Sequence, residues 1–92
     1  MKLPLFPLGQ VVATPGAIFA LGEAGETPAT YLKRHVLGDD GDLDAHDKAE
    51  NVSARKLGNR ILSAYTLGTG VKIWIITEAD RSSTTILLPE EY

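Results

Sequence analysis

The sequence contains no cysteine among its 92 residues. A disulfide framework and thiolate metal sites are therefore excluded, and we expect a cytoplasmic protein. Long apolar runs are also missing, because a stretch such as Val71–Ile76 is much shorter than the ~20 residues that cross a bilayer. The opening segment MKLPLFPLG has prolines before any apolar stretch develops, which is not the order of a secretory signal peptide. We therefore expect no membrane partner.

A strong excess of charge of either sign is absent as well. The formal net charge is −3, with 43% apolar and 23% charged residues, which is typical of an ordinary globular protein. The mild negative charge argues against non-specific binding to nucleic acid, so we expect no direct nucleic-acid partner. A chain of 92 residues is long enough for one compact domain, residues 1–92, with a modest core.

Two similar tripeptides predict the starts of two helices. In Thr14-Pro15-Gly16 and Thr27-Pro28-Ala29, a threonine can cap the helix, and proline takes the first position, where its missing N–H is not needed. Gly25 and Gly38 can end these helices, because glycine readily adopts the left-handed backbone conformation. A third helix should end at Gly58. The predicted helices span residues 15–24, 28–37 and, starting at Asp42 or Asp44, about as far as Leu57.

From Arg60 onward the apolar pattern indicates strands. A tight loop at 68–70 and a longer connection at 78–83 separate runs rich in β-branched residues. Residues 71–77 are apolar on both faces, which predicts a central strand covered on both sides. The predicted strands span 61–67, 71–77 and 84–88, with 10–13 as a candidate fourth. The fold class is therefore α+β, a three-stranded antiparallel meander packed against about three short helices.

The same patterns predict which side chains are buried. Trp74 is expected in the core, with Tyr65 on the neighbouring strand as its cross-strand partner. Tyr31 is expected to be partly exposed. The apolar stripe of the third helix is expected at Ala45, Ala49 and Val52.

Residues 38–51, GDDGDLDAHDKAEN, bring six acidic side chains and one histidine together. As a calcium loop starting at Asp40, this segment has Ala45 where a glycine is required and Asn51 where a glutamate is required. A transition-metal site would use His46 and Glu50, which are four residues apart and share a helix face. We keep these two as weak candidates and expect neither a metal nor a cofactor.

A simpler interpretation treats the same segment as the start of a helix. Asp42 or Asp44 can accept hydrogen bonds from free backbone N–H groups, and Asp47 lies in the first turn, where negative charge is favoured. Asp39 and Asp40 precede this cap and are therefore expected to be exposed, where they can contact a partner.

The connection at 78–83 is the second polar cluster. Arg81 can pair with Glu78 or Asp80 inside the loop, or it can be presented to a partner, because arginine is favoured in interfaces. No serine or cysteine stands in a nucleophile motif, so no catalytic residue is assigned. The candidate partner-binding residues are Asp39, Asp40, Glu78, Asp80, Arg81 and Ser82.

The chain resembles a family of small bacterial proteins that are encoded on plasmids, integrative elements and genomic islands. The resemblance covers nearly the whole chain and is strongest in PLGQVVATPGA, RHVLGDDGDLDAHDKAEN and VKIWIITEADRSSTTILLPEEY. Members are left hypothetical, or are labelled plasmid-related or type I restriction endonuclease subunit M. A methyltransferase subunit requires a nucleotide-binding α/β domain, for which this chain has neither the length nor the motif. The resemblance implies a mobile-element accessory protein and no reaction.

We therefore expect a non-enzymatic protein that acts by binding another protein. The most specific form of this hypothesis is that the protein inhibits a host restriction or CRISPR nuclease. One alternative is a small enzyme or toxin that uses His35 or His46 with nearby carboxylates. Another is a nucleic-acid-binding regulator with a basic face. An exposed apolar edge strand would also allow a homodimer. The residues of the basic face would be Lys33, Arg34, Arg55, Lys56 and Arg60.

Overall fold

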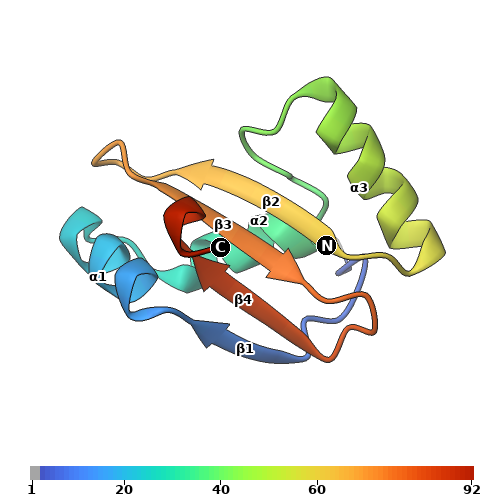
Figure 1. Ribbon diagram of the computed structural model, residues 1–92, viewed down its shortest axis with the longest axis horizontal. Helices are drawn as coiled ribbons and strands as arrows, with labels where there is room; N and C mark the ends of the chain where they lie inside the picture. Colours follow the sequence, from blue (N-terminus) through green and yellow to red (C-terminus); the bar gives the residue numbers. More distant parts are fainter. Residues whose placement is uncertain (1–2) are drawn as a thin grey trace.

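In the computed structural model, which describes residues 3–92, a four-stranded sheet is accompanied by three α-helices (Figure 1). Met1 and Lys2, part of the segment in which no signal peptide was expected, lie outside the described residues. The strands are β1 (Gln10–Ala13), β2 (Ile61–Thr66), β3 (Lys72–Thr77) and β4 (Ser83–Leu87). The helices are α1 (Pro15–Ala24), α2 (Pro28–Val36) and α3 (Ala45–Leu57), and a short 3-10 helix, η1 (Pro89–Glu91), follows β4. Within residues 3–92 no helix has both the length and the apolar composition that a membrane crossing requires.

The sheet has the strand order β1-β4-β3-β2. Strands β2, β3 and β4 form the predicted antiparallel meander. β1 adds a fourth strand that runs parallel to β4, with Gln10 opposite Ser83 and Ala13 opposite Ile86. The α+β fold class is confirmed, and β1 and β2 are the two edges of the sheet.

Local capping signals set the ends of α1 and α3 as predicted. The Thr14 hydroxyl accepts a hydrogen bond of 3.1 Å from the first turn of α1, and Gly25 leaves the helix with a φ of 67°. The Asp44 carboxylate accepts a 2.9 Å hydrogen bond from the first turn of α3, and Gly58 ends that helix with a φ of 75°. These ends are determined by residues within one turn of each other.

Helix α2 departs from the prediction at both ends. Thr27 was expected to cap it, but its side chain makes no capping hydrogen bond, and its hydroxyl lies 3.5 Å from that of Thr30 instead. The helix ends at Val36 rather than Leu37, and Gly38 then turns the chain with a φ of 86°.

Helices α1 and α2 supply the main core on one face of the sheet, and α2 lies behind the strands in Figure 1. Tyr31 is buried there, contrary to the expected partial exposure, because its ring packs against that of Tyr65 with centroids 5.1 Å apart. The buried cluster consists of Ala17, Ala20, Leu21, Tyr31, Tyr65, Leu67, Ile73, Ile75 and Ile86.

The opposite face of the sheet is less covered, with η1 in front of it in Figure 1. Trp74 belongs to this face and is only half-buried, with its ring edge-on to Tyr92 at 5.7 Å between centroids. The register places Trp74 opposite Ala64 and Tyr65 opposite Ile73. Because neighbouring residues of a strand point to opposite faces, Trp74 and Tyr65 cannot pair, and that prediction is wrong. β3 is fully covered on one face only.

Helix α3 lies along the β2 edge of the sheet (Figure 1). The predicted apolar stripe of α3 is wrong, because its buried residues are Asn51 and Ala54. The Asn51 side chain accepts a hydrogen bond from the Leu62 N–H at 3.2 Å and donates one to the Leu62 carbonyl. An amide side chain thus replaces a neighbouring strand at this position. The exposed residues of the predicted stripe are Ala45, Ala49 and Val52.

The loop before α3 completes this edge. Ala64 donates its N–H to the Asp40 carbonyl at 3.2 Å, and its own carbonyl accepts the Asp42 N–H at 2.7 Å. Gly41 lies between these two residues with a φ of 73°, and a side chain there would collide with the Ala64 carbonyl. Glycine is therefore required at this position for the loop to approach β2 so closely.

Candidate functional site

A chain of hydrogen-bonded polar side chains lies inside the core, beneath α2. His35 is 0% exposed, and its Nδ1 lies 2.6 Å from the Ser63 hydroxyl while its Nε2 lies 2.9 Å from the Thr77 hydroxyl. The Thr77 and Thr84 hydroxyl oxygens are 2.7 Å apart, and the Thr84 hydroxyl donates to the Leu8 carbonyl at 2.7 Å. The chain joins α2, three strands and the N-terminal arm.

The carbonyl at the end of this hydrogen-bonded chain determines the direction of the hydrogens as far as His35. A carbonyl only accepts, so Thr84 gives its proton to Leu8 and must accept from Thr77. Thr77 in turn accepts from Nε2 of His35, which therefore carries a proton. In the neutral imidazole the other nitrogen, Nδ1, then accepts the Ser63 hydroxyl.

The surroundings of His35 favour this neutral form. Burial, assisted by the positive charge of Arg55, lowers the pKa of His35 from 6.5 to about 4. The Phe6 ring also packs edge-on to the imidazole, 5.1 Å between centroids. A Ser–His hydrogen bond is part of a nucleophile–base pair in many hydrolases. Here Ser63 and His35 are both fully buried, so neither touches solvent.

Asp40, a candidate partner-binding residue, is buried rather than exposed. It is 5% exposed, and its carboxylate lies 3.3 Å from the guanidinium of Arg55 on α3. Burial raises the pKa of Asp40, and the Arg55 charge opposes that rise. The expectation of exposure failed because the loop is drawn onto the edge of β2. The Asp40 side chain thus stabilises the attachment of α3 and is not available to a partner.

Asp39 is exposed as predicted, but its polar groups are engaged. Its carboxylate pairs with Arg34 at 2.7 Å and accepts the Gly41 N–H at 3.1 Å, while its carbonyl accepts the Tyr65 hydroxyl at 2.6 Å. The Arg34 hydrogen bond is the main cause that lowers the pKa of Asp39. This residue fixes the turn between α2 and the β2 edge.

Arg81 is half-buried and points back into the molecule. Its guanidinium donates to the carbonyls of Asn59 at 2.7 Å and Ala54 at 3.1 Å, so it ties the β3–β4 connection to the C-terminal end of α3. The anticipated pairing with Glu78 or Asp80 carboxylates is not what holds it, because further bonds go to backbone carbonyls of the loop. Arg81 also has a φ of 60°, the one positive φ at a non-glycine position among residues 3–92.

The rest of the β3–β4 connection remains at the surface. Asp80 accepts the Ser82 N–H at 2.9 Å, and the Ser82 side chain, followed by this N–H, lowers the pKa of the Asp80 carboxyl. Glu78 is exposed. The partner-binding role of Glu78, Asp80 and Ser82 therefore stays a prediction.

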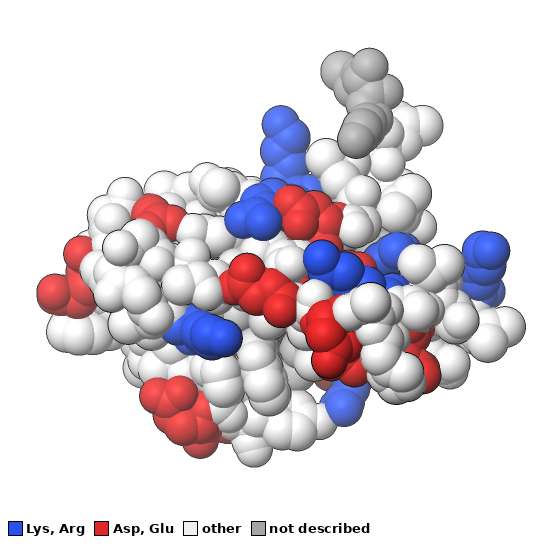
Figure 2. All heavy atoms as spheres, turned by 90° about the horizontal axis from the view of Figure 1, so that it is seen from above, with Lys and Arg blue, Asp and Glu red and all other residues white. Residues whose placement is uncertain are grey.

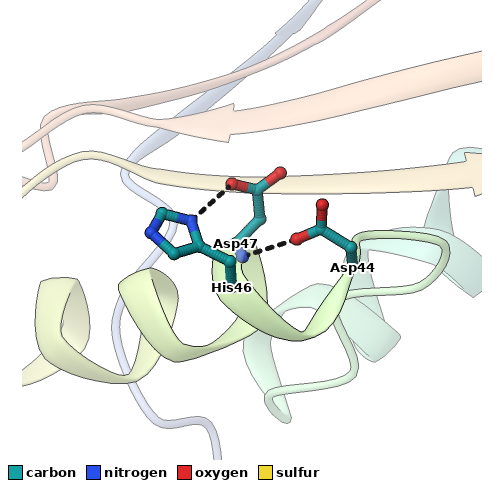
Figure 3. A group of neighbouring side chains, drawn as sticks. All are labelled: Asp44, His46 and Asp47. Carbon is teal, nitrogen blue, oxygen red and sulfur yellow. Dashed lines mark hydrogen bonds and ion pairs between the residues drawn. The ribbon is translucent and has the colours of Figure 1, made fainter.

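Figure 3 shows the acidic start of α3, where Asp44, His46 and Asp47 lie close enough to offer one ligand atom each. All three are exposed, and Asp44 already accepts the Asp47 N–H as the helix cap. His46 Nε2 lies 3.7 Å from Glu50, the weak metal pair named from the sequence. His46 is 80% exposed and flanked by solvent-facing carboxylates, an arrangement that surface helices commonly show without a bound ion.

Charges of opposite sign alternate over α3. Figure 2, which views the molecule from the α3 side, shows basic and acidic side chains interleaved rather than gathered by sign. Two members of the expected basic face, Arg34 and Arg55, are paired with Asp39 and Asp40. A nucleic-acid-binding face needs unpaired cations along one surface, so this arrangement lowers its electrostatic attraction for phosphates.

A hollow of about 280 Å³ opens on the less covered face of the sheet. Its floor is formed by side chains on the face of β3 and β4 opposite the main core: Ile76, Thr85 and Leu87. Ile76 and Leu87 are only 5% and 6% exposed, and Thr85 is half-buried. Its rim carries Arg60, Glu78, Glu91 and Tyr92. Among the candidate partner-binding residues named from the sequence, only Glu78 borders it, and Arg60 was named as part of the alternative basic face.

Two rim residues are already held in place. Arg60 lies over the Tyr92 ring, 5.4 Å from its centroid. Glu91 accepts the Thr14 hydroxyl at 2.6 Å and the Leu88 N–H at 2.8 Å, and the Thr14 bond is the main cause that lowers its pKa. In the sequence, the only sign of this hollow is that β3 is apolar on both faces. That pattern predicts a strand covered on both sides, whereas one face is only partly covered.

No protein-family model, no curated protein and no solved structure matches this chain.

Proposed function

We propose that this chain is a non-enzymatic accessory protein that acts in the cytoplasm by binding another protein through the hollow bordered by Arg60, Glu78 and Tyr92. The observation that carries the proposal is the composition of this surface. An apolar floor, an aromatic side chain and an arginine on a charged rim form the combination enriched at protein–protein interfaces.

The charges on the rim indicate the kind of partner. The Arg60 guanidinium already lies over the Tyr92 ring, and the Glu91 carboxylate already accepts the Thr14 hydroxyl. Glu78, at the start of the β3–β4 connection, is exposed, so its charge is accessible to a partner. A partner segment that places an apolar side chain on Ile76 and Leu87 with a lysine or arginine beside it would pair with Glu78. Nucleases carry basic surfaces for their substrates, so the resemblance to mobile-element proteins and this acidic rim favour a defence nuclease of restriction or CRISPR type.

Affinity capture with matched variants tests the proposal. The tagged chain would be expressed in a bacterium that carries an active restriction or CRISPR system, and retained proteins would be identified by mass spectrometry. Glu78→Lys and Tyr92→Ser should lose a partner that the unaltered chain retains. Glu90→Lys is the control, because Glu90 is an exposed neighbour that does not border the hollow.

Phage plating in the same strains tests the nuclease version separately. We expect the chain to raise plating efficiency when the nuclease is active, and Glu78→Lys to abolish that effect while Glu90→Lys keeps it. The proposed surface would be contradicted if Glu78→Lys, Tyr92→Ser and the control Glu90→Lys all lost the partner equally. It would also be contradicted if none of the three variants changed which proteins are captured.

A further inference from the structure

The two edges of the sheet differ in how their backbone groups are satisfied. On the β2 edge, the N–H and carbonyl of Leu62 bond the Asn51 side chain, and those of Ala64 bond the loop before α3. On the β1 edge, residues 3–92 supply no neighbouring strand beyond β1 itself. The sheet is therefore closed on one side and open on the other.

The open edge has a defined hydrogen-bonding pattern. Gln10 donates its N–H to Ser82 and Thr14 donates its N–H to Ile86, both toward β4. Because the backbone groups of alternate residues in a strand point to opposite sides, the N–H and carbonyl groups of Val11 and Ala13 point away from the sheet. These are the groups that an added strand would bond.

The β1 strand also lacks the features that protect open edges. Its sequence, Gln-Val-Val-Ala, contains no charge and no proline, and Val11 and Val12 are 43% and 42% exposed. Natural edge strands are blocked by lysine, proline, bulges or a covering segment, and without them the edge is a template for another strand.

We propose that this edge pairs with β1 of a second copy of the chain, antiparallel and centred on Val12. In this register Val11 of each copy faces Ala13 of the other, so every outward N–H and carbonyl of β1 is bonded. The pairing joins two four-stranded sheets into one across a two-fold axis.

The geometry of the flanking residues selects this register. Moving the centre to Val11 would place Ala13 opposite Gly9, whose φ of 64° is not extended. Moving it to Ala13 would place Val11 opposite Pro15, which has no N–H. Only the Val12-centred register bonds the outward N–H and carbonyl groups of both Val11 and Ala13 in each copy. Because β1 can bond all of these groups to another β1, we favour a second copy of the chain over an unrelated strand.

The size of the edge determines how strong the dimer is. The four residues of β1 span about 13 Å. Pairing along so short a strand buries less surface than the ~800 Å² per partner of a standard interface. Helix α1 follows β1 directly and exposes Ile18 and Phe19 to 59% and 69%, which provides further apolar surface beside the strand. We therefore expect a reversible dimer that forms on concentration and dissociates on dilution.

Sedimentation equilibrium over a wide range of protein concentration tests this dimer. The mass should rise from 9.9 kDa toward twice that value. Val11→Pro removes an outward N–H and places a ring against the incoming strand, while leaving the bonds to β4 intact, so it should stay at 9.9 kDa. Val11→Thr keeps the N–H and the branched side chain and should dimerise like the unaltered chain.

A second variant and an amide readout protect the test against misfolding. Val12→Lys sets two like charges against each other across the axis and should also remain monomeric. Hydrogen exchange should show the Val11 and Ala13 amides protected at high concentration and exposed at low concentration. A monomer at every concentration, or a dimer that Val12→Lys and a folded Val11→Pro leave unchanged, would overturn the inference. The result does not depend on the proposed partner, because it needs only the purified chain.

Discussion

His35 is tolerated in the core because each of its ring nitrogens has a hydroxyl partner, Ser63 on one side and Thr77 on the other. A buried polar group left without a partner costs about 1–3 kcal/mol, whereas a fully bonded chain contributes modestly and orders its neighbours. The hydrogen-bonded side chains reach from α2 to the Leu8 carbonyl, and their last member, Thr84, bonds the N-terminal segment to the sheet.

Replacing His35 by glutamine should destabilise the protein. A flexible amide cannot hold both hydroxyls at the imidazole positions and leaves part of the ring volume empty, so we expect a loss of about 2–4 kcal/mol in the free energy of unfolding. Urea denaturation measures this loss. His46→Gln is the control, because His46 is exposed and its replacement should stay within about 0.5 kcal/mol. Equal values for the two variants would contradict the structural role of His35.

Asp40→Asn separates the buried ion pair from a contact surface. It leaves the Arg55 charge, on a side chain that is only 14% exposed, without its buried carboxylate partner, so we expect a loss of about 3 kcal/mol in the free energy of unfolding. Asp39→Asn removes an exposed pair with Arg34 and should cost less than about 1 kcal/mol. A stable Asp40→Asn variant with weakened partner capture would instead return Asp40 to the role predicted from the sequence.

At the scale of the elements, α3 is attached to the sheet mainly by polar contacts. Asn51 bonds the Leu62 backbone, Asp40 pairs with Arg55, and Arg81 donates to the carbonyl of Ala54. Directional bonds fix the place of a helix whose outer surface is polar and whose apolar contribution is small. They also satisfy the β2 edge, so that sheet extension is confined to β1.

Asn51→Ala should expose the β2 edge without removing the helix. The Leu62 N–H and carbonyl lose their partner, so we expect a destabilisation of about 1–3 kcal/mol and faster hydrogen exchange at the Leu62 amide. Ser53→Ala, at an exposed position on the same helix, should leave both measurements nearly unchanged. If the Leu62 amide kept its protection in Asn51→Ala, another group would have to satisfy this edge.

At the scale of the whole molecule, the stability of the fold depends on pH through a few buried or paired groups. His35 takes up a proton near pH 6.5 in the unfolded chain but only near pH 4 in the folded one. Between these values the unfolded chain binds more protons, so the free energy of unfolding falls as the pH falls. Asp39, whose pKa is lowered mainly by Arg34, adds a loss only below its unfolded value of 3.8.

We expect the unaltered chain to lose about 3 kcal/mol of stability through His35 between pH 7 and pH 4, at about 1.4 kcal/mol per pH unit. Chemical denaturation at several pH values measures this dependence. The difference between the unaltered chain and His35→Gln isolates the histidine, because the carboxylates are common to both. A difference that stays constant over this range would show that His35 is not the group responsible.

The sequence alone determined the features that depend on neighbouring residues. Thr14 and Pro15 start α1 and Gly58 ends α3, because a capping bond or a left-handed φ involves residues within one turn. The sequence left Asp42 and Asp44 as alternatives for the start of α3, and the structure has Asp44. The runs of apolar and β-branched residues between turn segments likewise predicted the strands of the meander and the α+β class. These features need no knowledge of distant contacts.

Only the tertiary structure decided which polar side chains are buried. Asp40 was expected at the surface, and nothing in the local sequence indicated burial of His35 or Asn51. Each enters the interior because a partner distant in sequence satisfies it there. The hollow beside Glu78 arose in the same way, since the less covered face of the sheet is defined by where α1, α2 and η1 lie and not by β3 itself. Local sequence fixes the ends and types of elements, but burial depends on pairs of residues that folding brings together.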